Sequence, residues 1–170
     1  MKHLVLGGVR SGKSAYAEEQ IASFNKAVCY VATSQIWDEE MAERVRLHRA
    51  SRPKEWRVIE EPLALAELLN AVNSPEQAVI VECCSLWVSN LLCLEDEARL
   101  ESEKRALFQT IVDFKGDLVL VSSEVGLGIM PMNALARRFG DELGSINQQL
   151  AKLTDRVTFV AAGLPMQLKS

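Results

Sequence analysis

The glycine-rich segment at residues 7–14, Gly-Gly-Val-Arg-Ser-Gly-Lys-Ser, follows directly on the apolar run 3–6. Its spacing matches G-x-x-x-x-G-K-[ST], the pattern of a phosphate-binding loop. Such a loop joins a strand to a helix, because its glycines let the backbone curl around a polyphosphate and the helix presents its positive end. Ala17, Ile21 and Phe24 recur at the spacing of one helix face, which is the setting the motif requires. The alternative is an ordinary glycine-rich turn.

The residues of this loop have distinct expected roles in holding a nucleoside triphosphate. Lys13 is placed to reach the β- and γ-phosphates, and the hydroxyl of Ser14 is placed to hold Mg²⁺. We therefore take the whole motif as candidate nucleotide-binding residues, namely Gly7, Gly8, Val9, Arg10, Ser11, Gly12, Lys13 and Ser14.

Strand and helix patterns alternate along almost the whole chain. Strands are predicted at 3–6, 28–32, 56–59, 78–82, 117–122 and 157–161, with the last one closing the sheet. Helices are predicted after the loop, at 38–50, 63–72, 86–94 and 97–114, and in a long segment that ends near residue 153. This order predicts an α/β fold, a P-loop NTPase of the RecA-like kind with a mostly parallel sheet and helices on both faces. The length of 170 residues fits a single domain, 1–170.

The charge balance argues against a nucleic-acid partner. The net charge is -4 and the isoelectric point is near 5.3, although a small anionic ligand needs only local positive charge. Basic residues gather in the N-terminal third, where they either attract such a ligand or form a solvated basic face. They are Arg10, Lys13, Arg44, Arg46, Arg49, Arg52, Lys54 and Arg57.

The remaining composition favours a cytoplasmic protein. The chain starts at once with a strand rather than a secretory signal, and no apolar run is long enough to span a membrane. The four cysteines lack metal-ligand spacing, so we expect each of them to be buried and to pack as a small hydrophobic side chain. They are Cys29, Cys83, Cys84 and Cys93.

A second acidic group is needed near the metal of a phosphate-loop enzyme, usually at the end of a neighbouring strand. Glu82 closes the apolar run 78–82 and is the best candidate to hold Mg²⁺ together with Ser14. The alternative is a carboxylate that only ends a strand at the solvent boundary. Glu124 also follows a strand, and we take it as a weaker metal candidate and a plausible substrate contact.

His48 shares the inward face of the predicted helix 38–50 with Met41 and Val45. Such a histidine is more often a packed or capping residue. Its neighbours Arg44, Arg49 and Arg52 shift the balance, because guanidinium groups attract phosphates and a neutral imidazole is a competent nucleophile toward phosphorus. The other histidine, His3, lies inside the first strand and is expected to be structural.

Four segments in this order resemble one known family: GGVRSGKS at 7–14, VATSQIWDEEMAERVRLHRASRPKEW at 31–56, VECCSLWVSNLL at 81–92 and SEVGLGIMPMNALARRFGDELGSINQQLA at 123–151. The chain resembles, over nearly its full length, the bifunctional adenosylcobinamide kinases/adenosylcobinamide-phosphate guanylyltransferases of cobalamin biosynthesis. The resemblance implies phosphorylation of adenosylcobinamide by ATP or GTP, then transfer of GMP from GTP through a covalent histidine.

The resemblance also assigns residues. The histidine of the family's R-x-x-x-H-x-x-x-R-P segment carries the GMP and matches His48 here. The nucleotide site is implied to include Thr33, Ser34, Gln35, Arg49, Ala50, Ser51, Arg52, Glu60 and Glu82, with Mg²⁺ accompanying GTP or ATP. A homotrimer is implied as well.

Two positions depart from the family pattern. Ser123 stands where the family commonly has Asn before Glu-Val-Gly, and Gly140 stands where it commonly has Arg after the Phe of R-x-F-R-D. Neither touches the loop or His48. Two other functions stay open from the residues themselves: a P-loop kinase of another small metabolite, and a regulatory module that binds GTP.

Overall fold

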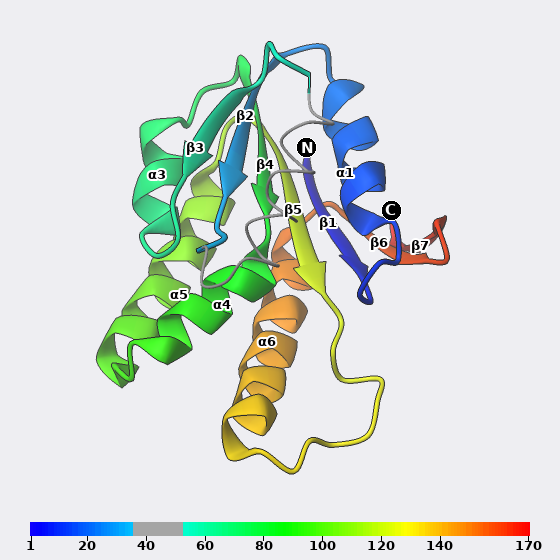
Figure 1. Ribbon diagram of the computed structural model, residues 1–170. Coiled ribbons are helices and arrows are strands. Elements are labelled where there is room, and N and C mark those ends of the chain that lie inside the picture. The colour runs from blue at the N-terminus through cyan, green and yellow to red at the C-terminus, as the bar shows by residue number, and fades with distance from the viewer. Residues whose placement is uncertain (36–52) are drawn as a thin grey trace.

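The computed structural model describes residues 1–35 and 53–170. The predicted helix at 38–50 and the candidate residues His48, Arg49, Ala50, Ser51 and Arg52 lie outside this described part. Within it, a mostly parallel sheet carries helices on both of its faces (Figure 1). The predicted α/β fold class is therefore confirmed.

In the described part of the chain, the sheet has seven strands in the order β3-β2-β4-β5-β1-β6-β7. Their bounds are β1 Lys2–Gly7, β2 Ala27–Ala32, β3 Arg57–Glu60, β4 Gln77–Glu82, β5 Asp117–Ser123, β6 Arg156–Ala161 and β7 Leu164–Lys169. Every neighbouring pair runs parallel except β6 and β7. The interior strands β1, β4 and β5 are almost wholly buried, because both faces of a parallel sheet are covered.

The helices are distributed unequally over the two faces. Helix α1 (Lys13–Ala22) packs on one face, and the other four described helices pack on the opposite face (Figure 1). Those four are α3 Leu65–Ala71, α4 Cys84–Cys93, α5 Glu97–Asp113 and α6 Ala134–Leu153. None of the described helices combines the length and apolar character needed to cross a membrane.

Most element ends differ from the sequence prediction by only one or two residues. Helix α3 begins at Leu65 rather than at 63, because the Glu61 carboxylate accepts hydrogen bonds from the N–H groups of Leu63 (2.9 Å) and Ala64 (2.7 Å). These two donors are thereby satisfied before the helix starts. Helix α5 begins after Asp96, whose side chain accepts from the N–H of Arg99 as an N-cap.

The prediction that strand 157–161 closes the sheet is wrong. Strand β7 follows it antiparallel across a two-residue turn, Ala162–Gly163, in which both residues have positive φ, 50° and 78°. Such hairpin turns usually carry Asn-Gly or Asp-Gly, so the sequence signal is weak. Pro165 weakens the strand signal further, and it is tolerated because β7 is the edge of the described sheet.

The prediction of buried cysteines is confirmed for Cys29, Cys83 and Cys84 and is wrong for Cys93, which is exposed at the end of α4. Burial raises the pKa of the first three thiols, so they stay neutral at physiological pH. Cys93 falls on the outer face of a helix whose other residues carry the core contacts.

His3 is a buried core residue, as expected. Its Nε2 lies 2.8 Å from the hydroxyl oxygen of Thr158 in β6, and its ring meets Tyr16 of α1 edge-on at 6.1 Å between centroids. Burial, followed by the positive charge of Arg156, lowers the pKa of His3 to about 4. The neutral imidazole thus joins β1 to β6 and α1.

We expect this histidine to make the fold sensitive to acid. The pKa of His3 is about 4 in the folded chain and 6.5 when unperturbed, so the unfolded chain binds the proton first as the pH falls. The free energy of unfolding should therefore decrease by about 2 to 3 kcal/mol through this group between pH 6.5 and pH 4. In urea titrations, His3→Gln should show a shallower pH dependence than wild type. Parallel pH curves for the two proteins would contradict this role.

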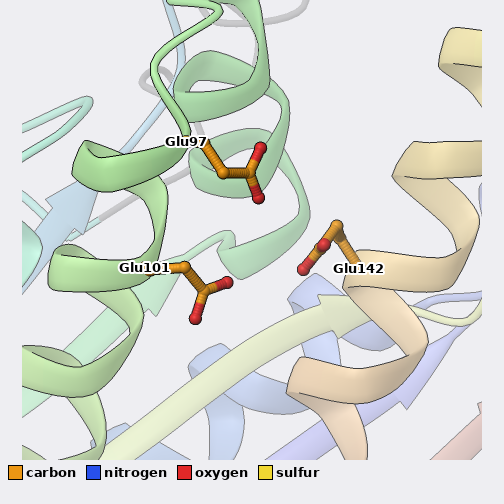
Figure 2. Close-up of side chains that lie close together, drawn as sticks. All are labelled: Glu97, Glu101 and Glu142. Carbon is orange, nitrogen blue, oxygen red and sulfur yellow. The ribbon is translucent and has the colours of Figure 1, made fainter.

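Three carboxylates gather between α5 and α6, and the oxygens of Glu97, Glu101 and Glu142 lie within 4.8 Å of one another (Figure 2). Basic side chains compensate them. Lys104 Nζ lies 2.6 Å from Glu101 and 2.9 Å from Glu142, and Arg138 pairs with Glu97. The cluster is therefore a network of ion pairs that joins the two helices. The Lys104–Glu142 pair is partly buried, and the exposed Arg138–Glu97 pair contributes about 0–1 kcal/mol.

Candidate active site

The carboxyl ends of the parallel strands bring the described candidate residues to one edge of the sheet. Gly7 at the end of β1 is in register with Ser123 of β5. Ala32 at the end of β2 is in register with Glu60 of β3 and with Glu82 of β4. Ligands of α/β proteins bind at this edge, so the phosphate loop, Thr33 and the two glutamates begin their loops on the same side of the molecule.

The loop between β1 and α1 is a tight turn that leaves the helix N-terminus open. The Ser11 N–H donates to the Gly8 carbonyl at 3.3 Å, and Arg10 and Gly12 have positive φ of 54° and 92°. No side chain caps α1 at Gly12. The first N–H groups of α1 are therefore the natural donors to a bound phosphate.

Lys13 lies against the loop that it follows. Its Nζ donates a hydrogen bond to the Gly8 carbonyl at 3.2 Å. A phosphate oxygen is a stronger, charged acceptor than this carbonyl, so the ammonium can exchange one partner for the other within the same loop.

Ser14 and Glu82 meet at the N-terminal end of α1. The Ser14 hydroxyl donates to Glu82 Oε1 at 2.7 Å, across sixty-eight residues of sequence. The main chain after Glu82 continues through a cis peptide bond to Cys83. The structure thus brings together the two residues that the sequence analysis selected for Mg²⁺, a hydroxyl and a carboxylate. Hard oxygen donors of this kind suit Mg²⁺, which keeps several waters and takes few protein ligands.

Thr33 is buried, and its described contacts tie strand ends together. Its hydroxyl donates to the Cys83 carbonyl at 2.8 Å and accepts from the Cys83 N–H at 2.8 Å. The Asn90 amide donates to the Thr33 carbonyl at 2.7 Å and to the Pro62 carbonyl at 3.1 Å. Thr33 and Asn90 therefore fix the loops after β2, β3 and β4 relative to one another.

The other described candidates also lie around the carboxyl ends of the strands. Ser34 and Gln35 are half-buried, at the end of the first described stretch, and Glu60 is exposed. The Glu124 N–H donates to the Gly7 carbonyl at 3.1 Å, which places this residue directly beside the phosphate loop. Its carboxylate accepts from the Gly126 N–H at 2.9 Å.

Of the two departures from the family pattern, Ser123 ends β5 in register with Gly7, the first residue of the phosphate loop. The Ser123 hydroxyl accepts from Ser85 of α4 at 3.2 Å. Gly140 lies within α6, and a β-carbon there would meet no atom within 4 Å. A larger side chain at this position is thus compatible with the helix packing.

Sequence reasoning missed the end of β6 and the turn that follows it as parts of this site. The Gly163 N–H donates to the Ser11 carbonyl at 2.8 Å. A β-carbon on Gly7 would lie 2.6 Å from the Val160 carbonyl oxygen, so this glycine is required by close backbone approach. The weak signal was the Ala-Gly pair between two apolar runs.

The parallel sheet, the loop and the Ser14–Glu82 pair define a P-loop NTPase of the RecA-like class. A crystal structure of the RadB recombinase is similar in fold, with a TM-score of 0.54 and 14% identity over 93% of this chain and 73% of that chain. Residues 3–168 match the family model of cobinamide kinase / cobinamide phosphate guanyltransferase, and the chain belongs to this family. A protein from Pyrococcus horikoshii OT3 also shares the fold, with a TM-score of 0.57 and 10% identity over 99% of this chain and 86% of that chain.

Three relatives match along nearly their whole length. The bifunctional adenosylcobalamin biosynthesis protein CobP of Pseudomonas aeruginosa is 47% identical over 99% of this chain and 98% of its own. The bifunctional adenosylcobalamin biosynthesis proteins CobU of Escherichia coli and Salmonella typhimurium are 39% and 40% identical, over 99% of this chain and all of theirs. The family resemblance predicted from the sequence is confirmed.

Proposed function

We propose that this chain catalyses two consecutive reactions of cobalamin nucleotide-loop assembly. It first transfers the γ-phosphate of ATP or GTP to the aminopropanol hydroxyl of adenosylcobinamide. It then transfers GMP from GTP to the new phosphate, giving adenosylcobinamide-GDP. The family match and the full-length relatives support this assignment. We further propose that the chain acts in the cytoplasm as a single domain, assembled as a homotrimer.

The contact between Ser14 and Glu82, 2.7 Å at the N-terminal end of α1, is the observation that carries the kinase half. It supports the proposal that Ser14 and Glu82 bind a metal beside Lys13 and the amides of the phosphate loop. In this proposal those amides and Lys13 hold the β- and γ-phosphates in place. The substrate hydroxyl oxygen forms a bond to the γ-phosphorus and its proton is released to solvent. The bond from that phosphorus to the bridging oxygen breaks, and the nucleoside diphosphate leaves.

Mg²⁺ fits the donors at this end of the loop. Ser14 and Glu82 would hold it through a hydroxyl and a carboxylate oxygen. When bound, the ion neutralises charge on the phosphate oxygens. Glu124, beside Gly7, is the proposed contact to the substrate that approaches the same edge.

The guanylyltransferase half needs a second reactive group, because it acts at the α-phosphorus and the kinase acts at the γ-phosphorus. We propose His48 as that group, on the sequence pattern alone. An imidazole nitrogen forms a bond to the α-phosphorus as pyrophosphate leaves. The substrate phosphate oxygen then bonds to the same phosphorus, the P–N bond breaks, and the imidazole is released.

The remaining candidates complete the nucleotide site in this proposal. Ser34, Gln35 and Glu60 line it from the ends of β2 and β3, with Glu60 toward the base or ribose. Arg49, Ala50, Ser51 and Arg52 accompany His48 and offset the charge of the transferred group. Thr33 contributes by holding the strand ends, through its bonds to Cys83.

The test is turnover of adenosylcobinamide by the purified protein with Mg-GTP, followed by liquid chromatography and mass spectrometry. We expect adenosylcobinamide phosphate to appear first and adenosylcobinamide-GDP to follow. A kinase of another metabolite would leave the corrinoid unchanged. A GTP-binding regulatory module would release GDP slowly, at a rate independent of the corrinoid. Either result would refute the proposal.

The proposed metal ligands Ser14 and Glu82 lead to a separate prediction. Ser14→Ala and Glu82→Gln should each raise the Mg²⁺ concentration for half-maximal phosphorylation by about tenfold or more, because the first removes the hydroxyl ligand and the second replaces a charged carboxylate by a neutral amide. Glu82→Asp should retain more activity than Glu82→Gln. Ser23→Ala, at the far end of α1, is the matched control. An unchanged Mg²⁺ midpoint in both variants would show that the pair does not hold the ion.

A further inference from the structure

The turn between β6 and β7 packs directly on the phosphate loop. Its Gly163 N–H donates to the Ser11 carbonyl at 2.8 Å, and a β-carbon on Gly12 would lie 3.1 Å from the Gly163 Cα. Gly7 at the start of the loop approaches Val160 of β6 in the same way. The hairpin thus lines the loop from its first glycine to its last.

The bond from Gly163 fixes one peptide plane of the loop. The peptide between Ser11 and Gly12 is trans, since the only cis bond among the described residues follows Glu82. In a planar trans peptide the C=O and the N–H point in opposite directions. With the Ser11 carbonyl held by the hairpin, the Gly12 N–H must point away from it, toward the inside of the loop where phosphate binds.

The hairpin itself is anchored at its far end. Lys169 of β7 donates from Nζ to the carbonyls of Ala151 (3.0 Å) and Lys152 (3.3 Å), near the C-terminal end of α6. A cation is favourable there, because the last carbonyls of a helix lack partners and carry partial negative charge. The hairpin is therefore held at its turn by the phosphate loop and at its far end by α6.

We propose that Gly163 is a positioning residue for triphosphate binding. Its backbone N–H sets the orientation of the Gly12 amide, and it does so without touching the nucleotide. The inference rests on the proposed function only in that the loop binds a nucleoside triphosphate. Glycine is favoured at 163 by its φ of 78°, while the space around its β-carbon position is open. A substitution there disturbs the turn through its backbone and not through a clash.

The sharpest test replaces the residue-163 amide by an ester, which removes only the N–H donor. A synthetic segment that begins at Ala161 and already carries the ester between residues 162 and 163 can be joined to the preceding chain by peptide ligation. Two substitutions accompany it. Gly163→Val disfavours the left-handed backbone, and Gly163→Asn tolerates it. Ala162→Gly is the matched control in the same turn, because it keeps the Gly163 donor.

The probes are inorganic triphosphate and GTP, each with Mg²⁺, in calorimetric titrations. We expect the ester and Gly163→Val to weaken binding of both probes by about tenfold, a typical effect of one hydrogen bond that orders a charged site. Gly163→Asn and Ala162→Gly should stay within about twofold of wild type. The KM for nucleotide should rise more than kcat falls.

Several outcomes would overturn the inference. Unchanged triphosphate affinity in a folded ester protein would do so. Weaker binding of GTP but not of triphosphate would also do so, because the turn would then contact the nucleoside. If the ester protein does not fold by circular dichroism, equal affinities for Gly163→Val and Gly163→Asn would refute it. Wild-type turnover of adenosylcobinamide is measured separately, so loss of the proposed function and loss of this inference are distinguishable.

Discussion

Lys13→Ala is expected to lower phosphorylation of adenosylcobinamide by about 10²–10³-fold, the usual effect of losing one donor to charge that develops in a transition state. The side chain lies within the phosphate loop, where its Nζ now bonds to the Gly8 carbonyl. Steady-state kinetics with Mg-GTP measure the loss. Lys115→Ala is the control. This exposed lysine precedes β5, so it lies at the amino ends of the parallel strands, opposite the candidate site.

Binding should fall together with turnover in Lys13→Ala. A weaker affinity for GTP, with an unchanged unfolding midpoint, would attribute the loss to the triphosphate site. Wild-type turnover in this variant would remove Lys13 from the mechanism, and a comparable loss in Lys115→Ala would indicate an effect of general charge.

His48→Ala is expected to abolish formation of adenosylcobinamide-GDP while phosphorylation stays within about threefold of wild type. The reason is that His48 supplies the nucleophile of the second reaction only. Mass spectrometry of the corrinoid products should show adenosylcobinamide phosphate accumulating. His3→Gln is the matched control, because the chain has two histidines and His3 is buried against Thr158.

A His48→Ala protein that still makes adenosylcobinamide-GDP would assign guanylyl transfer to another group. Loss of both reactions in His48→Ala would mean that this histidine serves the loop or the fold as well. Only loss of guanylyl transfer with retained phosphorylation agrees with the proposal that His48 acts in the second reaction alone.

The phosphate loop, Glu82 and the order of the elements were predictable from the sequence. The phosphate loop needs glycines and a lysine at fixed spacing, so residues 7–14 specify a strand, a turn and a helix together. Glu82 was selected because it closes an apolar run, and its hydrogen bond to Ser14 follows from parallel strands that end at one edge. The order of strands and helices followed from the spacing of apolar residues, which differs between a strand and a helix.

Features that depend on tertiary contact were not predictable in the same way. Strand β7 is exposed along its length and begins with Leu164 and Pro165, so it lacks the alternation of burial that marks a strand. Its position comes from pairing with β6 and from the hydrogen bond that Lys169 of β7 donates to the Ala151 carbonyl of α6. The hydrogen bonds of Thr33 likewise depend on Cys83, fifty residues away.

The most direct test of two chemistries in one chain uses GTP labelled at either the α- or the γ-phosphate. After incubation with Mg²⁺ and removal of free nucleotide, wild type should retain the α-label alone, as a bond that is labile in acid and stable in alkali. Digestion and mass spectrometry should place GMP on the peptide that contains His48. A folded wild-type protein that retains no α-label, or that carries it on another residue, would contradict the account.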